Sequence, residues 1–142
     1  GVEEALRVGS EAVDVGRPVG GVTFAFAQGC LSQALLAAGR TEEAARGFVS
    51  ATRAARDAGV VPYELGWTAL SLLPLAPEVG AAVLGATDTL FATNGDPDVY
   101  PPEDLLTPAR TAYETGYAEQ LARGRALGWP DVVSLLDDLD LG

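Results

Sequence analysis

Side chains with oxygen atoms at alternating positions are the first candidates for chemistry in this sequence. Asn94, Asp96 and Asp98 stand two residues apart in a stretch of turn-forming residues, a spacing that is found in calcium-binding loops. The calcium loop of an EF-hand needs glycine at its sixth position and glutamate at its twelfth, where this chain has Val99 and Leu105. We therefore interpret the stretch as a solvated loop and expect no metal site there.

The remaining polar residues give no better basis for catalysis. Glu42/Glu43 and Glu103/Asp104 are adjacent carboxylates, and we expect neither to be a catalytic pair because neighbours on a helix do not face each other. The chain has no histidine and no lysine, so it lacks the commonest general base and the amine of a Schiff base. We expect this chain not to be an enzyme, to have no catalytic residue and to bind no metal or cofactor itself.

Cys30 is the only cysteine, so no disulfide can form within the chain. Its neighbours are apolar, which predicts a small buried core residue. No apolar run reaches the roughly 20 residues of a membrane span, and the first ten residues lack the basic and apolar regions of a signal peptide. We expect a cytoplasmic protein with no part in a membrane.

Recognition of another molecule is the chemistry that the aromatic side chains of the second half support. They would line a groove for a peptide or a small ligand, or else pack in the core. The candidates are Tyr63, Trp67, Tyr113, Tyr117 and Trp129.

Three arginines of one predicted helix, Arg46, Arg53 and Arg56, are the other binding candidates. They would form a basic patch for an acidic partner, or else a solvated helix face with local charge pairs.

The net charge of -11 is unevenly distributed. Residues 1–60 hold seven acidic and six basic side chains, whereas residues 61–142 hold thirteen acidic and three basic ones, a net of 3 - 13 = -10. Phosphate backbones would be repelled by the second half and gain little from the first. We expect no direct binding of nucleic acid by this chain, and its composition leaves the oligomeric state undetermined.

Helical spacing of apolar residues recurs along the chain, while alternating strand patterns do not. The spacing predicts an all-α chain of about seven or eight helices. Gly39 is expected to end one helix, Thr41 to cap the next, and Thr107 to act as a further cap. Expected helices run over 2–15, from Pro18–Val22 to Ala38, 41–59, from Pro62 to Leu73, from Pro77 past Leu90, 107–127 with a break near Gly116, and a last short segment with Val132 and Leu139.

Residues 25–58 have the length of one tetratricopeptide repeat, 34 residues. Small residues let two antiparallel helices approach closely, and an aromatic ring fills the space between them. The pattern is met by Leu31, Ser32, Leu35, Gly39, Ala44, Phe48 and Ala51. We therefore predict a tetratricopeptide-like antiparallel helix-pair array, part of an α-solenoid, with a plain helical bundle as the alternative.

The first helix repeats part of this pattern, with Ala5 and Ala12 corresponding to Ala44 and Ala51. We predict a single helical-repeat domain over residues 1–142, with repeat helices over 1–58 and degenerate helices over 59–142. The chain has no methionine, even at position 1, so we expect it to belong to a larger protein.

The second half resembles the C-terminal helical region of actinobacterial LuxR-type ATP-binding transcription regulators and of related proteins with an adenylate-cyclase domain. The matching residues are Ala81, Ala82, Leu84, Gly85 and Ala86, then Pro101 and Pro102, then Gly124, Arg125, Ala126 and Leu127. The resemblance implies an ATP-binding domain upstream and a DNA-binding or cyclase domain elsewhere, with the helices here as a docking or sensing platform. None of the ATP-binding or DNA-binding motifs is in this chain.

Together these features predict a non-catalytic interaction and regulatory module of a larger ATP-dependent transcriptional regulator. Its partner would be a protein, a peptide or the upstream domains of its own protein. The alternative is a helical domain that senses a small-molecule effector.

Overall fold

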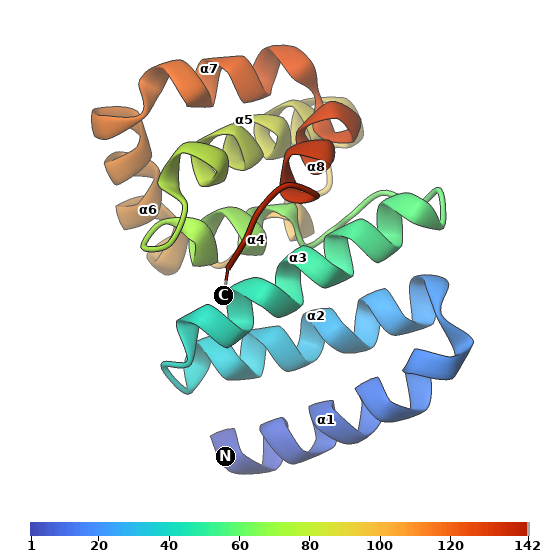
Figure 1. Cartoon of the computed structure of the whole chain (residues 1–142). Coiled ribbons are helices and arrows are strands. Elements are labelled where there is room, and N and C mark those ends of the chain that lie inside the picture. Colours follow the sequence, from blue (N-terminus) through green and yellow to red (C-terminus); the bar gives the residue numbers. More distant parts are fainter. Residues whose placement is uncertain (142) are drawn as a thin grey trace. The chain divides into compact units, whose positions relative to one another are not determined.

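A computed structural model describes residues 1–141 of the chain. These residues form eight α-helices and one short 3₁₀ helix, with no strand among them (Figure 1), so the predicted all-α class is confirmed. No helix in this part of the chain is both long enough and apolar enough to traverse a bilayer. The chain divides into two compact units, Gly1–Pro62 and the part from Tyr63 onward, which we call unit 1 and unit 2.

Unit 1 consists of three helices, α1 (Val2–Val19), α2 (Gly21–Ala37) and α3 (Thr41–Asp57). Both α1 and α3 pack against α2, which lies between them (Figure 1). The expected end of the first helix near residue 15 is wrong, because α1 continues through Pro18 to Val19. Pro18 cannot donate a main-chain hydrogen bond, and the helix ends one residue later.

Gly39 and Thr41 are both predicted from the sequence to shape the turn between α2 and α3. The prediction for Gly39 is confirmed, and the prediction for Thr41 is wrong. Gly39 has a φ of 79°, and the N–H groups of Gly39 and Arg40 donate to the carbonyls of Leu36 and Leu35, both at 3.0 Å. This pattern satisfies carbonyls that the helix end leaves open. Thr41 does not cap α3, because the turn ends at Arg40 and Thr41 is already the first helical residue.

The predicted stripe of α3 is buried. Ala44, Phe48 and Ala51 are fully buried, and Ala55 is only 3% exposed. Gly47 faces Ser32 of α2 so closely that a Cβ at this position would overlap the serine hydroxyl. Small residues at this contact thus allow α2 and α3 to approach each other.

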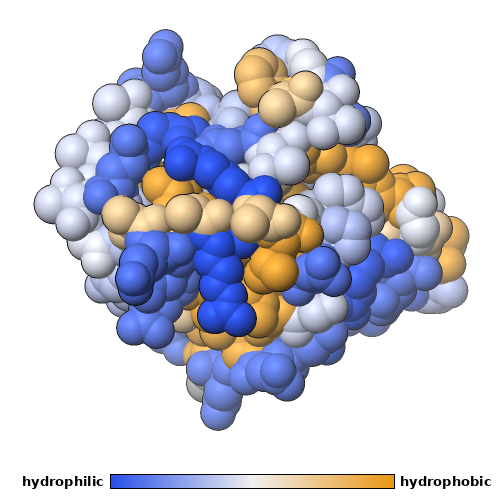
Figure 2. Space-filling model, turned by 90° about the horizontal axis from the view of Figure 1, so that it is seen from above, coloured by the Kyte–Doolittle hydropathy of each residue, from blue (hydrophilic) through white to orange (hydrophobic). Residues whose placement is uncertain are grey.

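Unit 2 is arranged around α5, against which α4, α7 and α8 pack (Figure 1). The face that carries α7 mixes hydrophilic side chains with smaller hydrophobic areas (Figure 2). The elements of unit 2 are α4 (Leu65–Leu72), α5 (Pro77–Asn94), η1 (Pro97–Val99), α6 (Glu103–Gly116), α7 (Ala118–Leu127) and α8 (Trp129–Leu136).

Of the three prolines that are expected to open helices in this region, only Pro77 does so. Pro77 opens α5, as expected, and α6 ends at Gly116, close to the predicted break. Pro62 lies outside α4, which begins three residues later, and Pro108 lies inside α6. Instead, α6 starts at Glu103. The negative charges of Glu103 and Asp104 in its first turn stabilise the helix because its N-terminus carries a partial positive charge.

The helices α5 and α7 touch through their backbones. A Cβ on Gly85 would overlap the carbonyl oxygen of Leu121, and a Cβ on Gly124 would overlap that of Ala82. Both glycines belong to the two segments, residues 81–86 and 124–127, on which the expected family resemblance depends. In this structure, those two segments form one close helix contact.

Candidate functional site

An open groove runs between α1 and α2 of unit 1, with a volume of about 730 Å³. Its walls are mostly apolar. The residues that shape it most are Val8, Ala12 and Val15 of α1, and Phe26, Ala27 and Cys30 of α2.

The α1 wall follows from the spacing of its apolar residues. Ala5, Val8, Ala12, Val15 and Val19 are separated by three and four residues in turn, so they share one helix face. A different face of α1 meets α2, because a Cβ on Gly9 would lie 3.1 Å from the Cα of Leu31. The apolar stripe of α1 therefore lies next to the α1–α2 contact and is not covered by α2.

Large apolar side chains at this groove are exposed to solvent. Val15 and Phe26 are 75% and 70% exposed, and Val8 is 49% exposed. Val19 continues the stripe of α1 and is 70% exposed. Contiguous exposed apolar surface on a folded protein marks an interaction site more often than scattered single residues do.

Charge is confined to one edge of the groove. Glu11 of α1 is the only charged residue that lines it, and α2 has no charged residue at all. Arg7 bonds to Glu11 at 2.9 Å and also to Glu4, so the three side chains form a chain of ion pairs along α1.

Cys30 is exposed at this groove, and its predicted burial is therefore wrong. The apolar residues around it in sequence divide between different faces of α2. Ala25, Gly29 and Ser32 are buried, whereas Phe26 and Cys30 lie on a face that remains open.

The five aromatic candidates of unit 2 do not line this groove. Tyr113 is fully buried, and its hydroxyl donates to the carbonyl of Ala69 at 2.6 Å. Burial raises the pKa of Tyr113 above its ordinary value. Tyr117 packs edge-on against Tyr113, with ring centroids 6.2 Å apart. Tyr63 is exposed, while Trp67 in α4 and Trp129 in α8 are half-buried.

The three arginine candidates lie on α3, where Arg46 and Arg56 each form an ion pair with a carboxylate of the same helix. Arg46 pairs with Glu42 at 3.2 Å, and Arg56 pairs with Asp57 at 3.0 Å. Arg53 is exposed. The local pairs lower the net charge that the predicted basic patch offers to an acidic partner.

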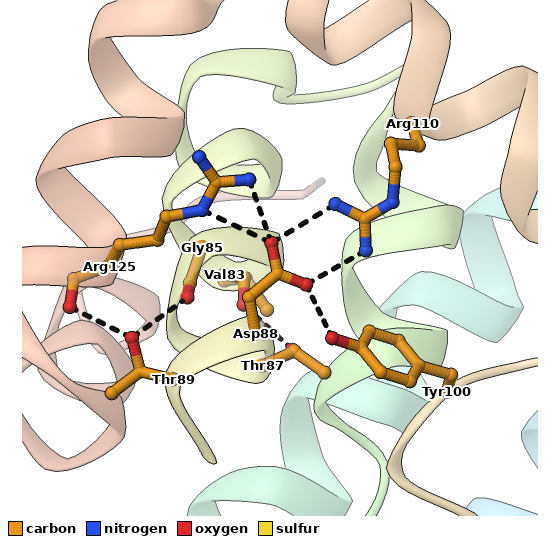
Figure 3. A network of polar contacts seen from close by, with 8 residues as sticks. All are labelled: Val83, Gly85, Thr87, Asp88, Thr89, Tyr100, Arg110 and Arg125. Atoms are coloured by element: carbon orange, nitrogen blue, oxygen red, sulfur yellow. Dashed lines mark hydrogen bonds and ion pairs between the residues drawn. The ribbon is translucent and has the colours of Figure 1, made fainter. Parts of the chain in front are cut away.

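Unit 2 contains a polar cluster centred on Asp88 of α5 (Figure 3). Arg110 of α6 donates to both carboxylate oxygens at 2.8 and 3.0 Å, and Arg125 of α7 donates to one of them at 3.0 and 3.2 Å. The Tyr100 hydroxyl donates to the same carboxylate at 2.5 Å. Thr89 adds a bond from its hydroxyl to the carbonyl of Arg125, at 2.9 Å.

The charges of this cluster compensate one another. Partial burial raises the pKa of Asp88, but the hydrogen bonds from Arg110, Tyr100 and Arg125 outweigh it and hold this pKa below its ordinary value. Burial, together with the bond to Asp88, raises the pKa of Tyr100 to about 12. Both carboxylate oxygens are engaged, so the cluster connects α5, α6 and α7 and presents no unpaired nucleophile.

Sequence reasoning missed both the groove and the Asp88 cluster. The groove had a signal in the three-and-four spacing of Val8, Ala12 and Val15. Asp88 had a weaker one, since it is a single charged residue among the buried residues of α5. Its partners stand 12 to 37 residues away, so no local pattern identifies them.

The stretch from Asn94 to Asp98, whose spacing is found in calcium loops, forms the end of α5 and a short turn. Asn94 is the last residue of α5, and the Asp96 side chain accepts from the N–H of Asp98 at 2.9 Å. Within residues 1–141, no group of three potential ligands among His, Cys, Asp and Glu is placed to hold a metal ion.

No protein-family model, no curated protein and no solved structure matches this chain.

Proposed function

We propose that this chain is a non-catalytic docking module whose α1–α2 groove receives an amphipathic helix of a partner protein. The observation that carries the proposal is the exposed apolar stripe of α1 beside Phe26 of α2. An apolar helix face that fits into an apolar groove is a common mode of peptide recognition.

The packing of unit 1 supports a helix as the occupant. On one side of α2, the apolar stripe of α3 buries Phe48 and its neighbours. The groove on the α1 side offers a surface of the same kind, still open. In tetratricopeptide-like arrays, a terminal helix that ends the array has a polar outer face. The exposed face of α1 is apolar, so a further helix could pack on it as α3 packs on α2.

The sequence resemblance supplies a context for this docking. In a LuxR-type or cyclase-linked regulator of the cytoplasm, binding at the groove would act on an ATP-dependent domain of the same protein. This role belongs to the proposal and rests on the residues of α5 and α7 that carry the resemblance.

A small-molecule sensor is the second candidate function. The groove volume of about 730 Å³ lies in the range of ligand pockets. Such pockets also place a few polar groups to orient the ligand. Among the groove residues only Glu11 and Thr23 have polar side chains, so the groove suits an apolar helix face better.

A synthetic amphipathic helix tests the docking function. The probe is a fluorescent helical peptide with leucines at three-and-four spacing and glutamine on its polar face, titrated with the whole chain. We expect binding by the wild type and a loss of at least about tenfold in affinity for Val15→Glu and Phe26→Glu, because each places a charge in the apolar contact.

Leu105→Glu is the matched control, since Leu105 is 44% exposed but lies in unit 2. It should leave the affinity unchanged. Equal affinities for the wild type and both groove variants would reject the groove as the docking site. Circular dichroism of each variant checks that the helices remain folded.

A further inference from the structure

We propose that the helix which occupies the α1–α2 groove carries arginine or lysine along the edge that lies over α1. This inference rests on the docking function proposed above and specifies the chemistry of the partner. Its basis is the distribution of charge around the groove.

All charge at the edge of the groove comes from one flank of α1. Glu4 and Glu11 each stand one residue before a member of the apolar stripe, Ala5 and Ala12, so both occupy the same flank of it. In paired helices, residues in this position meet the flanking residues of the partner helix. The opposite wall, α2, has no charged residue.

The two carboxylates remain accessible to a partner. Their side chains are 62% and 67% exposed, although both bond to Arg7. Asp14, which is also exposed, stands one residue before Val15 and seven after Arg7, so it lies on the same side of α1 as Arg7. One arginine against three carboxylates leaves a net charge of 1 - 3 = -2 beside the stripe. A cationic side chain of an incoming helix would therefore find uncompensated negative charge beside the apolar stripe.

The same charges disfavour a second copy of this chain as the occupant. If two α1 helices paired antiparallel around an axis near Ala12, Glu11 of one copy would face Glu11 of the other. The net charge of -11 also opposes self-association, whereas it attracts a basic partner. An anionic membrane surface would be repelled by this edge as well.

Three peptides of equal length and equal apolar stripe test the inference. They differ only along the flanks of the stripe, which carry lysine and arginine, glutamine or glutamate. Affinity is measured by fluorescence polarisation with the whole chain. Occupancy of the groove is read independently as slower reaction of Cys30, the only thiol of the chain, with an aromatic disulfide reagent.

We expect the basic peptide to bind about tenfold more tightly than the glutamate peptide at low salt, and to protect Cys30. The preference should shrink as the salt concentration rises, because exposed charges are screened. The double variant Glu4→Gln with Glu11→Gln should remove most of the preference for the basic peptide over the glutamate peptide.

The control variant Glu103→Gln with Asp104→Asn removes the same number of charges from unit 2, and the preference should persist in it. If this control loses the preference as fully as the groove variant, the attraction is a general effect of net charge and the inference is wrong. If all three peptides bind equally, the inference also fails while the docking function stands. If none binds, the docking function fails with it.

Two further outcomes would overturn the inference. Sedimentation that shows a dimer of the wild-type chain, lost in Val15→Glu, would identify a second copy as the occupant. Binding to vesicles of anionic phospholipid, lost in the same variant, would identify a membrane surface.

Discussion

In unit 1, the ion pairs of Arg7, Arg40 and Arg46 join residues three or four positions apart on one helix or its cap. In unit 2, Asp88 instead binds Arg110 and Arg125, which stand 22 and 37 residues further along the chain. The first kind of pair stabilises a single helix, and the second kind fixes helices relative to one another. The pairs of Arg7, Arg40 and Arg46 therefore serve local structure, whereas those of Asp88 serve tertiary structure.

The two units also differ in that α1 and α2 of unit 1 leave an apolar face open, whereas α5, the central helix of unit 2, is buried in its middle part. α1 and α2 present Val8, Val15 and Phe26 to solvent. In unit 2, Gly85 and Gly124 bring α5 and α7 into backbone contact, and α5 is buried over residues 80–87. This difference is why the candidate docking surface lies in unit 1 although most aromatic residues lie in unit 2.

The distribution of chromophores lets the units be observed separately. Both tryptophans, Trp67 and Trp129, lie in unit 2, and so do all four tyrosines. Tryptophan fluorescence therefore follows the unfolding of unit 2, whereas circular dichroism follows the helices of both units. Cys30 reports on unit 1.

The largest effect is expected for Phe48→Ala. Phe48 is fully buried, so the loss of its ring should lower the free energy of unfolding by about 4 kcal/mol. Phe26→Ala is the matched control, because Phe26 is 70% exposed, and should change it by less than about 0.5 kcal/mol. Urea unfolding followed by circular dichroism and Cys30 reactivity measures both. Similar losses for the two phenylalanines would contradict the exposed groove.

Gly124→Ala should destabilise unit 2 by about 3 kcal/mol, because the new Cβ forces the backbones of α5 and α7 apart. Gly116→Ala serves as its control, since no atom lies within 4 Å of the added Cβ. It should be neutral or slightly stabilising, as alanine favours a helix more than glycine does. Urea unfolding followed by tryptophan fluorescence distinguishes the two, and equal stabilities would argue against the close contact.

Asp88→Asn should cost about 2 kcal/mol at neutral pH, because two arginines lose their common carboxylate. Arg125 is half exposed, so its share is reduced by solvent screening. The pKa of Asp88 is lowered in the folded state, so the stabilisation is complete above the ordinary aspartate value of about 3.9. It is then lost as the pH falls through the lower folded-state value.

The difference in unfolding free energy between wild type and Asp88→Asn should therefore vanish at low pH. Urea unfolding followed by tryptophan fluorescence at a series of pH values measures this difference. The other carboxylates are the same in both proteins, so their contributions cancel. A difference that stays constant down to pH values below the folded-state pKa would show that the charge of Asp88 is not the cause.

Tyr100→Phe should have the smallest effect, about 1 kcal/mol, since one hydrogen bond to Asp88 is lost. The pKa of Tyr100 is raised to about 12, so this contribution is complete below the ordinary tyrosine value of about 10. It is lost as the pH rises through about 12. Ultraviolet titration of tyrosinate should show one high-pH ionisation fewer in the variant, and an unchanged titration curve would contradict the assignment.

Local sequence patterns were sufficient to predict much of the helical architecture. The stripe of Ala44, Phe48 and Ala51 is buried as its spacing predicts, and Gly39 ends α2 because a left-handed residue is needed there. Such features depend on residues a few positions apart, which interact in any helix. The same reasoning gave the wrong helix starts at Pro108 and Thr41. Pro108 lies inside α6, which starts at Glu103, and Arg40 rather than Thr41 precedes the first turn of α3.

Tertiary packing decided the candidate site. The sequence determined by itself that Val8, Ala12 and Val15 share a helix face, because helical periodicity fixes this. It did not determine whether that face is covered, and Cys30, predicted to be buried, is exposed for this reason. Likewise, an aspartate within α5 was visible in the sequence, but Arg110 and Arg125 become its partners only when three helices meet. Burial and long-range charge pairing depend on which helices come together, and no local spacing encodes that.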